Sequence, residues 1–161
     1  MSKSLMDENF LVSTIVEKAI GKNIHYYRSA FRKIIKNQNS HRFEKFAGFN
    51  FAAAIFTSVW FAYRRMWNYA IIILIIDVIL DIIFFKILHI EILYFIFTIA
   101  ISIYIGIYAN YFYMFSLNEK LIKSSDDDDN FIANSGTSFI GTIGFLFILF
   151  IIGIFRYKIG V

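Results

Sequence analysis

The sequence contains no cysteine and no proline among its 161 residues. The absence of cysteine excludes disulfide bonds, thiolate metal sites, cysteine nucleophiles and palmitoylated anchors. Catalytic signatures are missing too: there is no glycine loop for phosphate and no nucleophile elbow, and the three histidines, His25, His41 and His89, are too scattered to predict a zinc site. We therefore expect a non-enzymatic protein with no cofactor and no metal.

The composition is strongly apolar, with 58% hydrophobic residues, 20% aromatic residues and a mean hydropathy of +0.62. A soluble domain of this length could not bury so much apolar surface. The apolar residues are concentrated after position 46, whereas charges recur through the first 45 positions, which argues against a cleavable signal peptide. These features predict an all-α, multi-pass integral membrane protein. The bias toward Ile, Phe, Lys and Asn suggests a bacterial source, and hence a bacterial cytoplasmic (inner) membrane.

The N-terminal arm, residues 1–45, is the basic part of the chain. Its second half carries a net charge of +6 between Lys22 and Lys45, which exceeds the +4 of the whole chain. Helical periodicity predicts a first helix between Ser4 and Gly21 and a second, basic amphipathic helix after Asn23. We expect its cations to contact anionic lipid headgroups while its apolar stripe faces acyl chains or, alternatively, a partner protein. These candidate lipid-interface residues are Arg28, Arg32, Lys33 and Lys36. No recognised module predicts nucleic-acid binding.

Residues 46–161 form the predicted membrane domain, with apolar segments at about 46–63, 69–88, 92–115 and 139–155. A spanning helix needs about 20 residues, so the first segment is short for a crossing, and three to four transmembrane helices are expected. If all four segments cross, 12 basic residues lie inside and 4 outside; if the first enters and returns, the numbers are 13 and 3. The positive-inside rule does not separate these alternatives, but both place the N-terminus in the cytoplasm.

Two carboxylates, Asp77 and Asp81, interrupt the second segment, and they are the candidate ion- or proton-binding residues. Their spacing of four places both on one face of a helix. An ionised carboxylate in lipid is costly, so both must point inward and be neutral or paired. One interpretation is a proton or cation relay. The other is a buried cluster with Asn110, tyrosines or an arginine.

Small and polar residues form two candidate packing stripes. Thr98, Ser102, Gly106 and Asn110 follow one another at intervals of four in the third segment, while Gly141 and Gly144 lie in the fourth. Such stripes allow helices to approach closely, although the first could also line a polar conduit facing the two aspartates.

Aromatic and basic residues border the first segment. Tyr63, Arg64, Arg65 and Trp67 are of the types that anchor a helix at the lipid–water interface. The alternative is a specific site for a lipid headgroup or phosphate.

The stretch from Phe49 to Ala70 resembles the signature of a bacterial membrane family, domain of unknown function 2628. The matching residues are Phe49, Asn50, Phe51, Trp60, Tyr63, Arg64, Arg65, Met66 and Trp67, followed later by Gly106, Asn110 and Tyr113. The resemblance covers about residues 46–120 and leaves out the basic arm and the fourth segment. Thr57 and Ser58 stand where the family often has a Gly-Pro-like pair. The resemblance implies fold and location but no activity.

The functional hypothesis is a non-enzymatic accessory or scaffold subunit of a bacterial membrane complex. Its expected partners are anionic membrane lipids and other membrane protein subunits, or further copies of itself. The alternative is a small proton or cation transporter or channel that uses Asp77 and Asp81.

Overall fold

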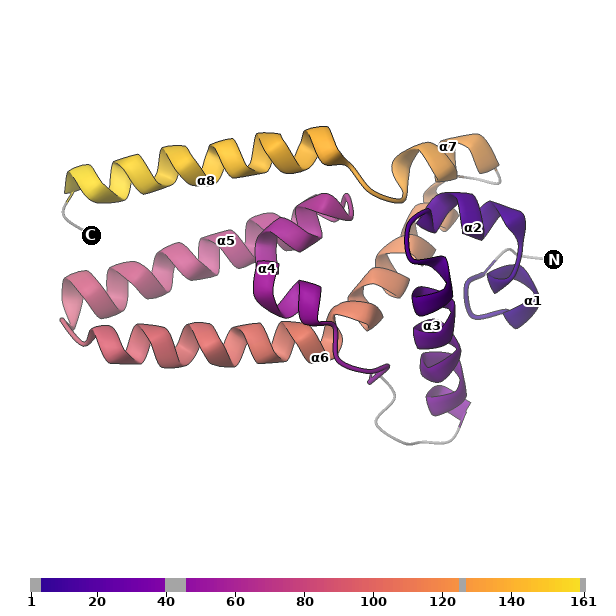
Figure 1. Cartoon of the computed structure of the whole chain (residues 1–161), viewed down its shortest axis with the longest axis horizontal. Helices are drawn as coiled ribbons and strands as arrows, with labels where there is room; N and C mark the ends of the chain where they lie inside the picture. The colour runs from indigo at the N-terminus through magenta and orange to yellow at the C-terminus, as the bar shows by residue number, and fades with distance from the viewer. Residues whose placement is uncertain (1–3, 40–45, 125–126, 160–161) are drawn as a thin grey trace. The chain divides into compact units, whose positions relative to one another are not determined.

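The computed structural model describes residues 4–39, 46–124 and 127–159, without the side chains of 38–39 and 157–159 (Figure 1). Within these ranges every regular element is a helix, which confirms the all-α prediction. The elements are α1 (Glu8–Leu11), α2 (Thr14–Ile20), α3 (Ile24–Asn39), α4 (Phe51–Tyr63), α5 (Trp67–Asp81), the π-helix η1 (Ile82–Ile87), α6 (Glu91–Lys123), α7 (Asp128–Asn134) and α8 (Phe139–Ile159).

Helix boundaries differ from the predicted ones where capping residues intervene. The single helix predicted before Gly21 is two helices, because Ser13 ends the first and its side chain accepts a hydrogen bond from the Val16 amide to begin the second. The third apolar segment continues well past residue 115, to Lys123.

The chain divides into two compact units. Unit 1 comprises Met1–Asn50 and Ile107–Thr137, and unit 2 comprises Phe51–Gly106 and Ser138–Val161. Helix α6 therefore contributes its first part to unit 2 and its second part to unit 1. The predicted domain boundary after residue 45 adjoins residues 40–45, which lie outside the described residues, and it stays a prediction.

Unit 1 has an apolar core with charged residues outside it. The buried core side chains include Leu5, Leu11, Val16, Ile20, Tyr27, Phe31, Ile34, Ile35, Tyr113, Met114, Leu117, Leu121 and Phe131. Tyr113 of α6 lies against Tyr27 and Phe31 of α3, with ring centroids 4.9 and 5.9 Å apart. The apolar stripe of α3, predicted to face acyl chains or a partner protein, is thus covered by the chain's own residues.

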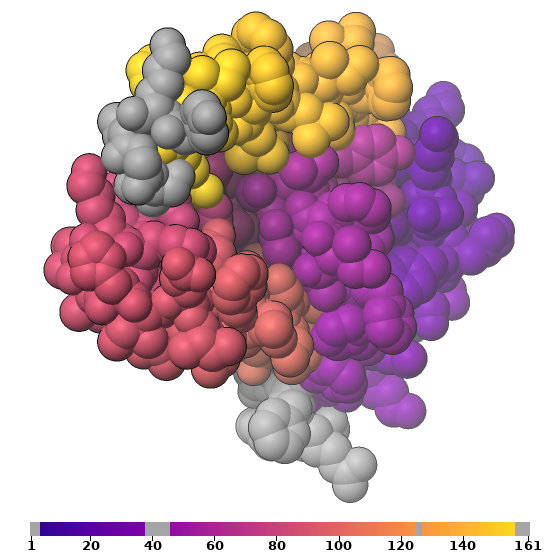
Figure 2. All heavy atoms as spheres, turned by 60° about the vertical axis from the view of Figure 1, so that its left-hand side comes forward, coloured from indigo at the N-terminus to yellow at the C-terminus, as the bar shows by residue number. Residues whose placement is uncertain are grey.

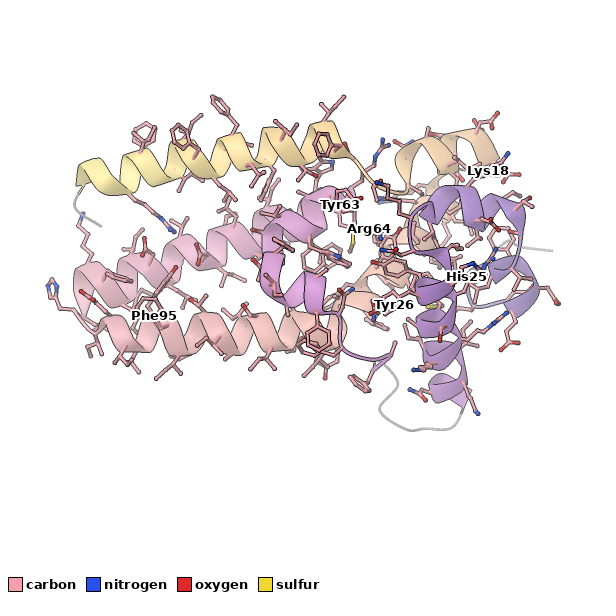
Figure 3. All side chains as sticks on the ribbon, in the orientation of Figure 1. Lys18, His25, Tyr26, Tyr63, Arg64 and Phe95 are labelled. Carbon is pink, nitrogen blue, oxygen red and sulfur yellow. The ribbon has the colours of Figure 1, made fainter. Side chains whose placement is uncertain are left out.

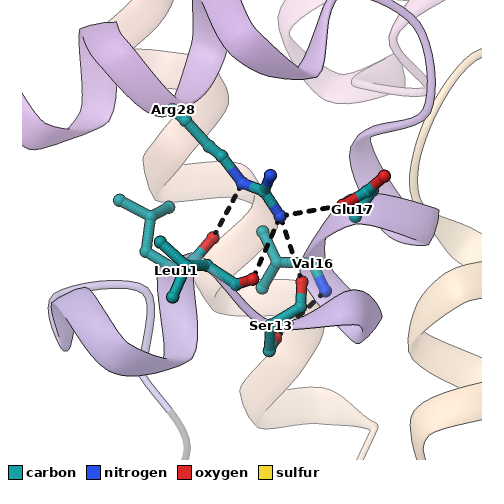
Figure 4. A network of polar contacts seen from close by, with 6 residues as sticks. Leu11, Ser13, Val16, Glu17 and Arg28 are labelled. Atoms are coloured by element: carbon teal, nitrogen blue, oxygen red, sulfur yellow. Dashed lines mark hydrogen bonds and ion pairs between the residues drawn. The ribbon is translucent and has the colours of Figure 1, made fainter.

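Arg28 fastens α3 to the segment between α1 and α2 (Figure 4). Its guanidinium donates to the carbonyl oxygens of Leu11, Val12 and Ser13 at 3.2–3.4 Å and pairs with Glu17 at 3.1 Å. One side chain thus supplies hydrogen-bond donors to the Leu11 and Val12 carbonyls at the end of α1, and a further donor to the Ser13 carbonyl, which also accepts from the Glu17 amide. Arg28 therefore has a structural role within unit 1, apart from the lipid contact that the sequence predicted for it.

In unit 2, α5 and α8 run in the same direction. At their starts, the Ser138 amide donates to the Tyr63 carbonyl at 2.8 Å and Trp67 lies against Phe145. At their ends, Arg156 contacts Asp77 and Asp81. Helix α6 returns antiparallel to α5, with Phe84 stacked on Phe97. Figure 2 shows α8 in yellow beside the α5–α6 hairpin in pink.

The outer surface of unit 2 is apolar. Ile72, Phe95, Ile140 and Phe147 are 54–85% exposed, and many other Ile, Leu and Phe residues of α5, α6 and α8 resemble them (Figure 3, where Phe95 is labelled). Two described stretches, Glu91–Lys123 and Asp128–Arg156, are long and apolar enough to cross a membrane. Only 17% and 6% of the residues in the most apolar part of these two stretches are buried, whereas the core helices of a soluble protein are mostly buried.

Helix α4 is broken at its middle. Thr57 has φ 37° and ψ −111°, a conformation that a β-branched residue rarely adopts and that cannot continue a helix. The break divides 13 residues into two short pieces, and α4 visibly bends in Figure 1.

Candidate functional site: an ion-pair cluster beside a polar cavity

The structure brings Asp77, Asp81 and Arg156 together in unit 2. The Arg156 Nη2 atom lies 3.3 Å from Asp77 Oδ2, and its Nε atom lies 3.0 Å from Asp81 Oδ2. The Nε–H bond is not aligned for a hydrogen bond, so the second contact is an ion pair only. The Asp81 side chain is 10% exposed and that of Asp77 37%. Both carboxylates share one face of α5, as their spacing predicts.

Tyr94 at the start of α6 completes the cluster. Its hydroxyl donates to Asp77 Oδ1 at 3.0 Å, so each Asp77 oxygen has one donor. A carboxylate offers about four lone-pair sites, and Asp77 therefore keeps the capacity to accept more. The two carboxylates and one guanidinium carry a formal net charge of −1.

A cavity of about 320 Å³ adjoins Asp77. Its lining comes from α4, α5, α6 and α8 and is mostly apolar, but it includes five side chains with oxygen atoms: Thr57, Ser58, Asp77, Thr98 and Ser102. The Thr98 hydroxyl is buried and makes no hydrogen bond. The break in α4 thus lies at the wall of a cavity that also contains a carboxylate.

Unit 1 contains a second polar centre, built around Asn110 of α6. The Asn110 carbonyl oxygen accepts from Asn50 Nδ2 at 3.0 Å, and its amide donates to the Tyr26 hydroxyl at 2.9 Å and to the Gly48 carbonyl at 3.2 Å. Tyr26 is labelled in Figure 3. Asn110 is fully buried, and these bonds satisfy its amide with partners from two segments, α3 and residues 48–50. The arrangement holds residues 48–50 and α3 against the second part of α6.

An open basic groove of about 470 Å³ lies on the outer face of α3. Its lining includes His25, Ser29, Arg32, Lys33 and Lys36, all exposed. These positions follow one stripe of the helix, opposite its buried apolar face. The groove can attract anions such as phosphate groups.

A sequence-family match includes most of the residues described above, although not Arg156 of α8. The model of the family described as "Protein of unknown function (DUF2628)" matches residues 25–118, more than half of the chain. The chain belongs to the DUF2628 family. Comparison with curated proteins and with solved structures gives no match.

The DUF2628 match begins at residue 25, earlier than the motif resemblance alone indicated. It therefore includes α3, which the sequence comparison left outside. Two groups of motif residues meet in the structure: Asn50 of the first pairs with Asn110 of the second, at a sequence separation of 60. Tyr113 of the second group is fully buried against α3. The family residues of unit 1 thus hold α3, residues 48–50 and α6 together.

The predicted packing glycines of the DUF2628 chain differ from one another. A Cβ atom at Gly141 would lie 2.7 Å from the Trp67 ring, so α8 and Trp67 approach closely there. Gly106 is buried as well. Gly144 is exposed, with nothing within 4 Å of such a Cβ atom. It therefore does not pack against the described part of the chain.

The predicted interface residues Tyr63, Arg64, Arg65 and Trp67 are not equally accessible. Arg64 is 2% exposed and lies over the Tyr63 ring at 5.7 Å, so it does not face the surroundings as an interface anchor would. Trp67 is 39% exposed and Arg65 is half-buried. Burial of the Arg64 side chain within the fold replaces the expected contact with headgroups.

Sequence reasoning did not identify Arg156 or Tyr94 as partners of the aspartates. It allowed for an arginine or tyrosines, and Arg156 is one of the few cations bordering the apolar segments. The sequence did indicate that a partner was needed, because two carboxylates in an apolar segment require a cation. The sequence does not indicate which helix supplies it.

Proposed function

We propose that this DUF2628 protein is a multi-pass protein of the bacterial cytoplasmic membrane, with unit 2 in lipid and the N-terminus in the cytoplasm. The observation that carries the proposal is the outward-facing apolar surface of unit 2, within which Asp77 and Asp81 pair with Arg156. In water, leaving an Ile or Phe side chain exposed rather than buried costs about 1.5–3 kcal/mol of free energy. In hydrocarbon the same surface carries no such cost.

We infer three crossings, made by α5 with η1, by α6 and by α8. Helix α5 and η1 contain 15 and 6 residues and α8 contains 21, which suffices for about 30 Å of hydrocarbon. The part of α6 that belongs to unit 2, residues 91–106, rises about 24 Å before the helix continues into unit 1. Helix α4 has 13 residues and would span only about 20 Å even if it were straight. Its break at Thr57 supports a re-entrant segment. This favours the arrangement with 13 basic residues inside and 3 outside.

Unit 1 would lie at the cytoplasmic surface and present its basic groove to anionic headgroups. Because the apolar face of α3 is covered, this contact is electrostatic and involves Arg32, Lys33 and Lys36 more than Arg28. Each cation near an anionic surface contributes about 1 kcal/mol.

The molecular role that we propose is that of a non-enzymatic accessory or scaffold subunit. The polar residues described above form pairs with one another, as in Asn50 with Asn110, rather than a nucleophile beside a base. On α8, the exposed Gly144 and Gly153 leave open space in which another transmembrane helix, from a partner or a second copy, could approach closely.

Two experiments test this role. Alkaline extraction of membranes should leave the protein in the pellet; recovery of the dispersed chain in detergent-free buffer would contradict insertion. Purification in mild detergent should yield a complex that Gly144→Leu weakens, whereas Ile140→Leu, at an 85% exposed position, should not. Recovery of the parent protein only as a monomer would exclude the subunit role.

A second candidate function, proton or cation transport, is favoured by the net charge of the cluster and the cavity beside Asp77. Asp77→Asn and Asp81→Asn should then abolish flux in proteoliposomes without changing assembly. Absence of flux in the parent protein would remove this candidate.

A further inference from the structure

We propose that the cavity bounded by α4, α5, α6 and α8 binds one partly hydrated alkali-metal cation, with Asp77 as its charged ligand. This inference rests on the membrane insertion proposed above but not on transport. The two aspartates then differ in role: Asp81 forms an ion pair with Arg156, while Asp77 contacts Arg156 and Tyr94 and also lines the cavity.

The charge of the cluster calls for one more positive charge. Asp77, Asp81 and Arg156 sum to −1, and an uncompensated charge in an apolar environment is expensive. Asp77 is the more exposed of the two carboxylates, and its lone pairs exceed its two observed donors. A single monovalent cation at Asp77 would neutralise the cluster.

The polar lining favours a hard cation. Oxygen is the donor atom in all five polar side chains, Thr57, Ser58, Asp77, Thr98 and Ser102, and hydroxyl and carboxylate oxygens are ligands for hard ions. Sites for Ca²⁺ are rich in carboxylates, whereas this lining holds one. The Thr98 hydroxyl is buried and makes no hydrogen bond. A hydrated ion in the cavity would supply the missing partner, either as the ion itself or as one of its waters.

The size of the cavity indicates that the ion keeps water. A volume of about 320 Å³ is far larger than a bare ion, and each water occupies about 30 Å³ in the liquid. The remaining lining is aliphatic or aromatic, from Ile55 and Phe56 of α4 to Leu149 of α8. Such walls lower the local dielectric constant and strengthen the attraction between the ion and Asp77.

The test measures thermal unfolding of the purified protein in detergent, titrated with sodium chloride or potassium chloride against choline chloride at equal ionic strength. Binding to the folded state raises Tm with concentration. We expect a rise with at least one alkali chloride that choline does not produce. Asp77→Asn should lose it, and the matched variant Asp81→Asn should retain it in weaker form.

A milder variant guards against a folding defect. Thr98→Val keeps the shape of the side chain, and loss of its hydroxyl should raise the apparent dissociation constant by about 2- to 10-fold. Identical curves for alkali and choline salts, as expected if a proton neutralises the cluster, would overturn the site. Unchanged titrations of Asp77→Asn and Thr98→Val would do the same. Alkaline extraction of the parent protein separates failure of the cation site from failure of membrane insertion.

Discussion

Units 1 and 2 differ in where they place large apolar and charged side chains, in the interior or on the surface. In unit 1, Phe31 is fully buried and Lys33 is exposed; in unit 2, Phe147 is 62% exposed and Asp81 is 7% exposed. One helix, α6, takes part in both arrangements. The contrast teaches that composition alone does not define the environment of a segment, because the solvent on each side of the helices decides which residues turn inward.

The largest expected effect comes from matched truncations of phenylalanine. Phe31→Ala should lower the free energy of unfolding by about 3–5 kcal/mol, because it opens a cavity in the core of unit 1. Phe147→Ala should change it by less than about 1 kcal/mol, because no protein atoms surround the ring on its outer side. Denaturant unfolding in detergent measures both. Equal losses would mean that Phe147 is buried against protein and would remove the contrast.

The next effect concerns charge on the outer surface. Phe147→Arg places a guanidinium in the proposed hydrocarbon and should cost insertion about 2.5–3.5 kcal/mol. The control Ile122→Arg changes a residue of unit 1 with a similar exposure of 67% and should be tolerated. The membrane-integrated fraction after alkaline extraction reports the difference. Full integration of Phe147→Arg would contradict a lipid environment at that position.

The polar centre of unit 1 should give a smaller loss. Asn110→Ala removes the partner of Asn50 and Tyr26 and should destabilise unit 1 by about 1–3 kcal/mol, since buried donors and acceptors are left unsatisfied. The exposed Asn9→Ala is the control. Thermal unfolding compares them, and a neutral Asn110→Ala would show that the hydrogen bonds contribute nothing net.

The smallest effect belongs to the basic groove. Lys33→Gln should weaken binding to vesicles containing anionic lipid by about 1 kcal/mol, or roughly fivefold, with less effect at high salt. Lys18→Gln, an exposed cation of α2 that does not line the groove, should matter less. Sedimentation with vesicles measures the two variants. Equal weakening would make the contact a matter of net charge rather than of this groove.

The helices of this protein could be predicted well from its sequence because their signals are local. Apolar runs define α5, α6 and α8, and Gly21 closes α2 as expected. The break at Thr57 was less predictable, since neither Thr57 nor Ser58 is a strong helix breaker. The related Gly-Pro-like pair at this place in the family was the available hint.

The partners of each helix face could not be predicted. Periodicity showed that α3 has an apolar stripe, but not that Tyr113 of α6 covers it. The spacing of Asp77 and Asp81 predicted a shared face that needs a cation, yet Arg156 lies 75 residues beyond Asp81. Contacts between helices distant in sequence depend on tertiary packing, which a local pattern does not encode.

Cysteine labelling in intact cells tests the central claim most directly, because the chain has no native cysteine. With unit 2 in lipid, three crossings and a re-entrant α4, an impermeant thiol reagent should label Glu91→Cys from outside. It should label Asp129→Cys only after the cells are opened. Labelling of Asp129→Cys in intact cells, with Glu91→Cys protected, would mean that α4 crosses the membrane; labelling of both in a soluble extract would contradict membrane insertion itself.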